Sequence, residues 1–128
     1  MKKLIIVIAS MMLAAVAAGA QEQAAVQAAE QVVVDDYKIV SDRIEDGVRY
    51  IVATPSAKVC SKQIDIQIKD GIIQSVVYTK GCEGNAKGIG ALIKDMSVEE
   101  AIRRLEGINC GKRGTSCPDQ LAKVLKSI

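Results

Sequence analysis

The sequence predicts an α+β domain in which a three-stranded antiparallel sheet is followed by about three helices packed on one of its faces. Two observations carry this prediction. Isoleucines alternate with polar residues before an Asp-Gly pair, which is typical of a β-hairpin, and later segments repeat apolar residues at helical spacing behind capping residues. Because the chain has three tyrosines and no phenylalanine or tryptophan, its core has to consist of aliphatic side chains.

The first 20 residues have the features of an export signal. Lys2 and Lys3 precede an uncharged apolar run, and Ala18 and Ala20 are small residues at the two positions that a signal peptidase reads. We expect cleavage after Ala20 and a periplasmic or secreted protein that is free of the membrane. The alternative is an uncleaved anchor, because Leu4 to Ala20 spans 17 residues, which is the lower limit for crossing a bilayer.

The charge balance argues against one class of partner. Cleavage would remove two lysines and leave 15 basic residues against 15 acidic residues. A neutral chain of this kind is not expected to bind nucleic acid through bulk charge. The remaining chain of about 108 residues has room for one domain.

We place that domain at residues 48–128. The segment 21–47 is predicted to be a linker, since it begins rich in alanine and glutamine and ends in a polar run from Ser41 to Gly47 that is typical of a loop. Val48 to Thr54 then supplies the first strand, and Pro55 ends it.

The next two strands form a hairpin around Asp70 and Gly71. A two-residue turn pairs residues whose numbers sum to 141, so that Ile68 faces Ile73, Ile66 faces Ser75 and Ile64 faces Val77. The same register sets Cys60 against Gly81 and Val59 against Cys82. The two cysteines are therefore expected near each other at the open end of the hairpin, although strand parity alone sends their side chains to opposite faces.

Three helices are predicted after the hairpin. The first runs from about Ala86 to Lys94, the second follows a capping box of Ser97 and Glu100 and ends at Gly107, and the last has Pro118 in its first turn. The apolar stripes of the second and last helices belong to the core and consist of Val98, Ala101, Ile102, Leu105, Leu121, Val124, Leu125 and Ile128.

The glycine-rich stretch around the first helix has two interpretations. Glycines cost about 1 kcal/mol each inside a helix relative to alanine, so they usually permit a close approach. The ordinary approach is tight packing of helix on sheet. The alternative is a loop that cradles an anion or a nucleotide, with candidate residues Gly81, Gly84, Asn85 and Gly88.

The most specific chemistry lies in four cysteines in a chain without histidine: Cys60, Cys82, Cys110 and Cys117. Without histidine, neither a Cys/His zinc site nor a histidine-activated nucleophile can form, and we predict no catalytic residue. Cys82 and Cys117 precede helices, where the helix dipole favours the thiolate. Lys112 and Arg113 are expected in a solvated loop, where their charge also lowers neighbouring thiol pKa values.

Three arrangements of these sulfurs stay open. All four can ligate one zinc ion or iron–sulfur centre. They can instead form disulfides that join Cys60 to Cys82 and Cys110 to Cys117, which an oxidising compartment favours. In the third arrangement, Cys110 and Cys117 form an exchangeable redox pair.

The cysteine-bearing segments contain a set of specific motifs: Val59-Cys60-Ser61, the Asp70-Gly71 turn, Gly81-Cys82-Glu83-Gly84-Asn85, Gly107-Ile108-Asn109-Cys110-Gly111 and Thr115-Ser116-Cys117-Pro118-Asp119-Gln120-Leu121-Ala122. With these motifs the chain resembles the four-cysteine form of the TSCPD domain family over about residues 48–128. Related domains occur at the C-terminus of adenosylcobalamin-dependent ribonucleotide reductases. The resemblance implies an accessory link to ribonucleoside-diphosphate reductase with a regulatory or nucleotide-related role, and not the reductase activity itself.

A weaker likeness is to iron–sulfur scaffolds of the IscU/NifU type. Cys60, Cys82 and Cys117 fall where that scaffold has its three cysteines, whereas Lys62 and Ser116 stand where it has an aspartate and a histidine. Cys110 is additional. This likeness implies a sulfur-ligated site and does not extend to cluster assembly.

The sequence as a whole predicts a small exported domain that binds zinc or an iron–sulfur centre for a structural or partner-recognition role, with a protein as its partner. It is not expected to be an enzyme by itself. The alternatives are a disulfide-stapled interaction module and a reductase-linked accessory protein that carries out thiol redox chemistry or binds a nucleotide.

Overall fold

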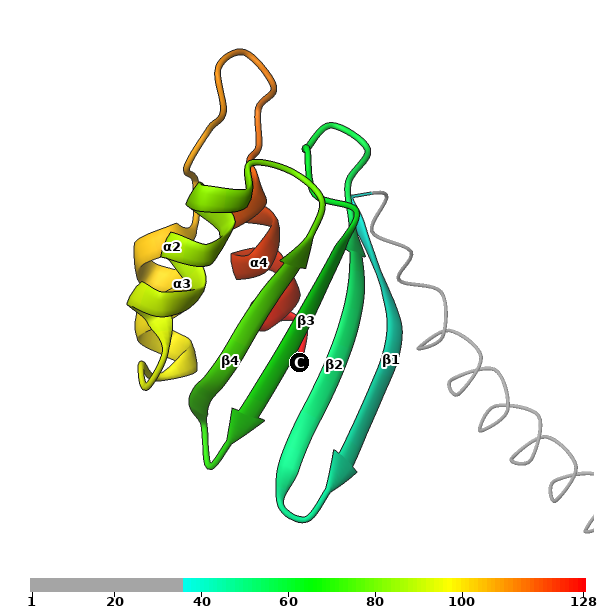
Figure 1. Cartoon of the computed structure of the whole chain (residues 1–128), viewed down its shortest axis with the longest axis vertical. Helices are drawn as coiled ribbons and strands as arrows, with labels where there is room; N and C mark the ends of the chain where they lie inside the picture. Colours follow the sequence, from blue (N-terminus) through cyan, green and yellow to red (C-terminus); the bar gives the residue numbers. More distant parts are fainter. Residues whose placement is uncertain (1–35) are drawn as a thin grey trace, which may run out of the picture. The chain divides into compact units, whose positions relative to one another are not determined.

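Four antiparallel strands follow one another along the chain and form one sheet in the order β1-β2-β3-β4 (Figure 1). The computed structural model describes residues 36–128, so the predicted signal (1–20) and residues 21–35 of the linker lie outside the described residues. The strands are β1 (Tyr37–Glu45), β2 (Val48–Pro55), β3 (Gln63–Lys69) and β4 (Ile72–Thr79), and the helices that follow are α2 (Glu83–Ile93), α3 (Val98–Leu105) and α4 (Cys117–Lys126).

Within residues 36–128, no helix is both long enough and apolar enough to cross a membrane.

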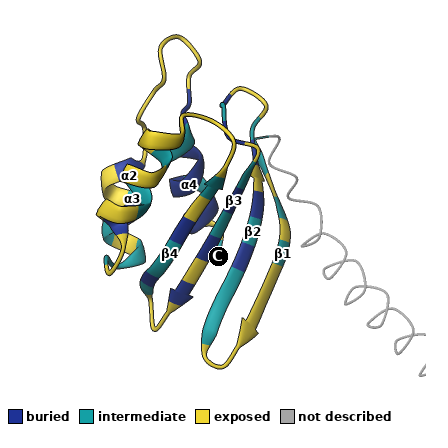
Figure 2. Cartoon of the chain, viewed as in Figure 1, coloured by how far each residue is buried: buried dark blue, intermediate teal, exposed yellow. Residues whose placement is uncertain are grey.

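The sheet has four strands and not the predicted three, because β1 replaces the loop that was expected from Ser41 to Gly47. Asp46 and Gly47 have φ angles of 52° and 77°, which is the left-handed conformation of a two-residue hairpin turn. Asp70 and Gly71 form the same turn, as predicted, with φ angles of 52° and 73°. The polar run is compatible with a strand because β1 lies at the edge of the sheet, where most of its side chains meet solvent (Figure 2).

A β-bulge in β4 changes the register that the hairpin turn sets. Ile68 faces Ile73 as predicted, but Gln67 faces Ser75 and Ile66 faces Val76, so the numbers of opposed residues sum to 142 instead of 141 beyond the bulge. The predicted pairs of Ile66 with Ser75 and of Ile64 with Val77 are therefore wrong. The physical reason is burial: the extra residue turns Val76 into the core and leaves Val77 exposed.

The aliphatic core lies between the sheet and the helices, which cover one face of it (Figures 1 and 2). The predicted apolar stripes of α3 and α4 contribute to this core. Gly90 of α2 makes the closest approach to the sheet, since a Cβ at this position would lie 2.6 Å from the carbonyl oxygen of Val76. Tight packing of helix on sheet, the ordinary interpretation of the glycine-rich stretch, thus explains Gly90, while a Cβ at Gly88 would meet nothing within 4 Å.

Two of the cysteines lie at the N-terminal ends of helices. Ser97 caps α3 by accepting a hydrogen bond from the Glu100 backbone N–H (3.2 Å), as the capping box predicts. Ser116 caps α4 in the same way through the Asp119 N–H (3.2 Å), so Cys117 is the first residue of that helix. Helix α2 begins at Glu83, three residues before the predicted start, and its N-cap is Cys82, whose side chain makes no capping hydrogen bond.

Candidate sulfur site at the open end of the β3–β4 hairpin

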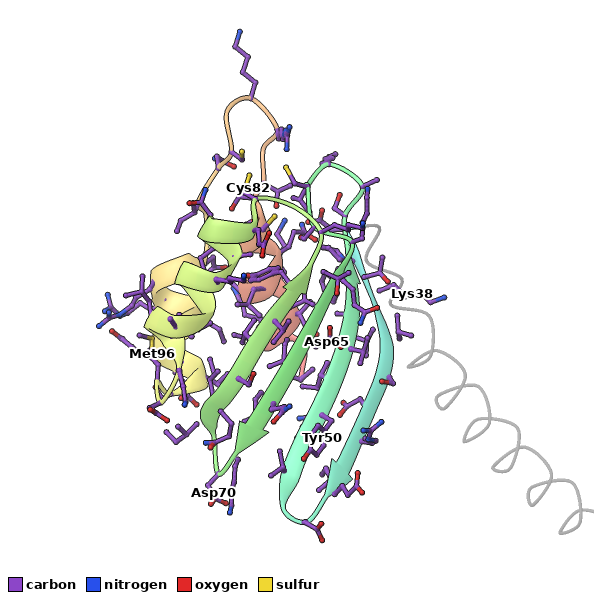
Figure 3. All side chains as sticks on the ribbon, viewed as in Figure 1. Lys38, Tyr50, Asp65, Asp70, Cys82 and Met96 are labelled. Atoms are coloured by element: carbon purple, nitrogen blue, oxygen red, sulfur yellow. The ribbon has the colours of Figure 1, made fainter. Side chains whose placement is uncertain are left out.

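All four cysteines line one pocket of about 470 Å³. The pocket lies where β3 begins and β4 ends, between the start of α2 and the loop 106–116 that leads into α4. Figure 3 shows Cys82 at the start of α2, below this projecting loop. All four cysteines are free thiols, of which Cys82 and Cys110 are exposed and Cys60 and Cys117 half-buried.

Cys60 and Cys82 lie just beyond the paired part of the hairpin, which ends at Gln63 and Thr79, and both line the pocket. Gly81 lies against Cys60, as the register of the hairpin turn predicted, since a Cβ at Gly81 would be 3.4 Å from the Cys60 Cβ. Cys82 is close enough to Cys60 to lower the pKa of the Cys60 thiol. Gly81 allows this approach, because its φ of 93° is left-handed and a Cβ there would lie 3.2 Å from the Ser61 backbone nitrogen.

Cys117 is held from two sides by polar side chains of the hairpin. The Ser61 hydroxyl, which is almost fully buried, donates to Cys117 Sγ at 3.2 Å. The Tyr78 hydroxyl donates to the Cys117 backbone oxygen at 3.3 Å. Burial raises the pKa of Tyr78, and negative charge on Cys117 raises it further, so Tyr78 stays a neutral donor at ordinary pH.

Arg113 reaches back from its loop into the group of sulfurs. Its Nη1 donates to Cys60 Sγ at 3.1 Å, although the two residues lie 53 positions apart in the chain. This hydrogen bond and the charge of Arg113 lower the pKa of Cys60, and smaller contributions from Cys82 and from the charge of Lys62 lower it further. Cys60, Cys110 and Cys117 in turn raise the pKa of Arg113. The sequence analysis expected a solvated loop at this position, and it missed this specific contact.

The loop that carries Cys110 and Arg113 is anchored by Asp119. This carboxylate is only 5% exposed. It accepts hydrogen bonds from the Gly107 backbone N–H (2.8 Å) and the Thr115 hydroxyl (2.6 Å), one at each end of the loop. Burial alone would raise the pKa of Asp119, but these two hydrogen bonds and the ion pair with Lys123 (3.2 Å) outweigh it and lower the pKa.

A second buried polar residue, Gln120, ties the loop to distant segments. Its Oε1 accepts from the Ser56 backbone N–H at 2.9 Å, and its Nε2 donates to Thr115 at 3.0 Å and to Asp36 at 3.1 Å. Asp36 also pairs with Lys123. The residues around Cys117 therefore mostly serve to hold the loop in place. The sequence signal for this role was the presence of two polar residues, Asp119 and Gln120, in the first turn of a helix whose next residues are apolar.

The predicted anion or nucleotide loop shares a wall of this pocket with the cysteines. Gly81, Gly84, Asn85 and Gly88 all line it. A Cβ at Gly84 or Gly88 would meet nothing within 4 Å, so these glycines leave open space beside the sulfurs. Lys80 and Arg113 are basic side chains of the same lining.

The four cysteines line one pocket, but they do not form a complete binding site for a single metal ion. In the part of the chain that the structure describes, no three cysteine, aspartate or glutamate side chains are grouped so that they could hold a metal ion. The thiols are soft sulfur ligands in a positively charged setting, since Lys80 and Arg113 line the same pocket.

Fold and pocket together define a small α+β domain with four free cysteines gathered at one end of an antiparallel sheet. The family model described as the TSCPD domain matches residues 35–128, and the chain therefore belongs to the TSCPD domain family. The matched region includes β1 as well as the cysteine-bearing segments. Searches of curated proteins and of solved structures gave no match to the chain.

Proposed function

We propose that this domain binds one sulfur-ligated centre, zinc or iron–sulfur, in the four-cysteine pocket, and that the centre serves structure and partner recognition more than catalysis. The observation that carries the proposal is that all four cysteines of the described chain line the same pocket, although they come from widely separated positions. Cysteine is the only soft ligand type that gathers there, and thiolates are the preferred ligands of zinc and of iron–sulfur clusters.

The surroundings of the sulfurs favour the deprotonated ligands that such a centre needs. Cys82 and Cys117 lie at the N-termini of α2 and α4, where the helix dipoles stabilise negative charge. Arg113 and Ser61 donate to sulfur atoms, as residues around ligands do in metal sites. A bound centre would join the hairpin, two helix starts and the loop, and would thereby stabilise all of them.

Elemental analysis of protein purified without oxygen tests the proposal. We expect zinc or iron near one centre per chain, and a clear loss of it in Cys117→Ser. Ser127→Ala, a change near the end of the chain and far from the pocket, serves as the control and should keep the full metal content. Four reduced thiols without metal in the folded protein would reject the proposal.

A specific contact favours one alternative, a disulfide between Cys60 and Cys82 that staples the hairpin end of an interaction module. The two cysteines line the same pocket, and Cys82 is close enough to lower the pKa of the Cys60 thiol. Counting reactive thiols after denaturation separates the two proposals, because a metal site releases four thiols whereas this disulfide leaves at most two. Four reactive thiols in protein prepared under air would rule out the disulfide.

A further inference from the structure

We infer that Gln120, which the proposed function does not use, is the positioning residue of the sulfur pocket. Its side chain joins the loops that carry Cys60 and Cys110 to the first turn of α4, where Cys117 lies. The inference deepens the proposed function and rests on it only where metal binding is measured. It depends on which groups Gln120 binds and on how near these groups lie to the cysteines.

The side-chain amide of Gln120 is fully buried, and both of its ends are hydrogen-bonded. Oε1 accepts from the Ser56 backbone N–H at 2.9 Å, while Nε2 donates to the Thr115 hydroxyl at 3.0 Å and to the Asp36 carboxylate at 3.1 Å. The orientation of the amide is fixed, because a backbone N–H needs an acceptor and a carboxylate needs a donor. One side chain therefore links three segments that lie far apart in the sequence.

The bond to Ser56 reaches the loop 56–62, which carries Cys60. Ser56 is the first residue after β2, and its carbonyl oxygen accepts a hydrogen bond from the Val59 N–H at 3.2 Å. Val59 directly precedes Cys60. The turn that begins at Ser56 thus ends beside this cysteine.

The bond to Thr115 reaches the loop 106–116, which carries Cys110. The Thr115 hydroxyl accepts from Gln120 and donates to Asp119 at 2.6 Å. The backbone oxygen of Thr115 accepts from the Cys110 N–H at 3.1 Å. Hydrogen bonds that follow one another in this way polarise and strengthen each other. Only one residue, Thr115, therefore separates Gln120 from Cys110 in the network.

The two loops meet in the pocket through Arg113. This residue of the loop 106–116 donates to Cys60 Sγ at 3.1 Å, and the contact requires both loops to keep their places. Gln120 bonds the base of both loops, whereas the buried carboxylate of Asp119 bonds only the loop 106–116. In residues 36–128 every buried side-chain nitrogen and oxygen has a hydrogen-bond partner, so removing the Gln120 amide would leave buried groups unpaired.

Hydrogen exchange of single backbone N–H groups, followed by nuclear magnetic resonance, tests the positioning role without metal. Gln120→Met keeps the length of the side chain and removes its amide. We expect the N–H groups of Val59 and Cys110 to exchange about 10-fold faster or more, because each closes a loop that has lost its anchor. The Ala101 N–H, which bonds the Ser97 oxygen at 3.0 Å at the start of α3, is the control and should be unchanged.

Zinc titration of the reduced full chain against a chromophoric chelator measures the effect on the pocket. Gln120→Met should weaken zinc binding about 10-fold or more, as loss of a residue that orients metal ligands does. Val124→Ala shortens a fully buried side chain of the same helix and is the control for stability alone. It should lower the free energy of unfolding and leave the zinc dissociation constant unchanged.

Thr115 offers a second pair of variants, which also covers failure of Gln120→Met to fold. Thr115→Val keeps the shape of the side chain and removes the hydroxyl, whereas Thr115→Ser keeps the hydroxyl. We expect faster exchange of the Cys110 N–H and weaker zinc binding in Thr115→Val, and values close to those of the unchanged protein in Thr115→Ser. Circular dichroism shows for each variant that the domain is folded.

The outcomes separate the inference from the proposed function. Faster exchange at only one of the two N–H groups in Gln120→Met would overturn the joint role of this residue. Faster exchange at both with an unchanged zinc dissociation constant would show that Gln120 secures the loops without positioning the sulfurs, which overturns the inference while the metal function stands. If the unchanged protein binds no zinc, the metal function fails for zinc, and the exchange rates still decide whether Gln120 holds both loops.

Discussion

Arg113 places a positive charge beside the neighbouring thiols. It donates a hydrogen bond to Cys60 Sγ at 3.1 Å, and the charges of Cys60, Cys110 and Cys117 all raise its own pKa. A guanidinium stays charged throughout the pH range in which proteins are stable. Its effect on Cys60 is therefore present whether or not a ligand is bound.

We expect Arg113→Gln to raise the pKa of Cys60 back toward its ordinary value of 9.0, because the largest contribution that lowers it is removed. The rate of alkylation of Cys60 at neutral pH should then fall, and the midpoint of its pH profile should move upward. The measurement is made on a variant in which the other three cysteines are serine. An identical profile with and without Arg113 would show that the guanidinium does not act on this thiol.

Asp119 is the second residue with a large expected effect. Asp119→Ala would leave the Gly107 N–H and the Thr115 hydroxyl without their acceptor, and we expect a loss of about 1–3 kcal/mol in the free energy of unfolding. Chemical denaturation measures this loss. Glu99→Gln, a change of an exposed carboxylate on α3, is the control and should stay within about 0.5 kcal/mol of the unchanged protein.

The same carboxylate predicts a pH dependence. The pKa of Asp119 is lower in the folded state than its ordinary value of 3.8, so its stabilising contribution is complete above pH 3.8 and is lost as the pH falls through the lowered pKa. In Asp119→Asn the free energy of unfolding should therefore fall less steeply between about pH 4 and pH 2. If the free energy of unfolding falls equally steeply with pH in both proteins, the acid lability belongs to other groups. Asp36 is one such group, because its pKa is also lowered.

At the scale of elements, the β3–β4 hairpin shows what a sequence determines and what it leaves open. Asp70 and Gly71 predict the turn, because only residues that tolerate positive φ fit there. The bulge leaves no such local signal, since the choice between Val76 and Val77 as the core residue depends on how α2 packs against β4. Turn chemistry is local and predictable, whereas register beyond a bulge is decided by tertiary packing.

The strand β1 was missed for a related reason. The polar run before Gly47 resembles a loop when only composition is considered, but an edge strand is allowed to be polar. The Asp46-Gly47 pair was the available signal, and it repeats the turn residues that identified the other hairpin. Sequence reasoning brought the four cysteines to one end of the sheet, while the contact of Arg113 and the anchoring roles of Asp119 and Gln120 depend on long-range packing that no local pattern shows.

Helix α2 offers a matched pair of glycine substitutions. In Gly90→Ala the new Cβ would meet the Val76 carbonyl oxygen at 2.6 Å, and we expect a loss of about 1–3 kcal/mol in stability because backbone has to move. In Gly88→Ala the Cβ meets open space, so the higher helix propensity of alanine should raise stability by up to about 1 kcal/mol. Thermal or chemical denaturation measures both, and equal effects of the two changes would contradict the close approach at Gly90.

At the scale of the whole molecule, β1 belongs to the folded domain and is not a linker that leads into it. Tyr37 and Ile39 pack against the core, and Asp36 bonds Gln120 and Lys123 of α4. The family match accordingly begins at residue 35, before this strand. Both the sheet edge and the last helix therefore depend on this strand.

A chain that begins at Val48 should consequently be less stable than one that begins at Val34, by about 2–5 kcal/mol, because two large apolar side chains and the Asp36 contacts are lost. Denaturant titration of the two shortened chains beside the full chain gives the difference. If the chain from Val48 unfolds at the same denaturant concentration as the chain from Val34, β1 contributes nothing to the stability of the domain.

The extra residue in β4 has a consequence for how such a domain can change over evolutionary time. Side chains alternate between the two sides of a strand, so inserting or deleting one amino acid between Gly71 and Gly81 would reverse the direction in which every later position of the strand points. The thiol after Gly81 would then be displaced from its partner across the hairpin. Length variation among related chains should therefore be rare in this short stretch and common in the glycine-containing loop before Thr115.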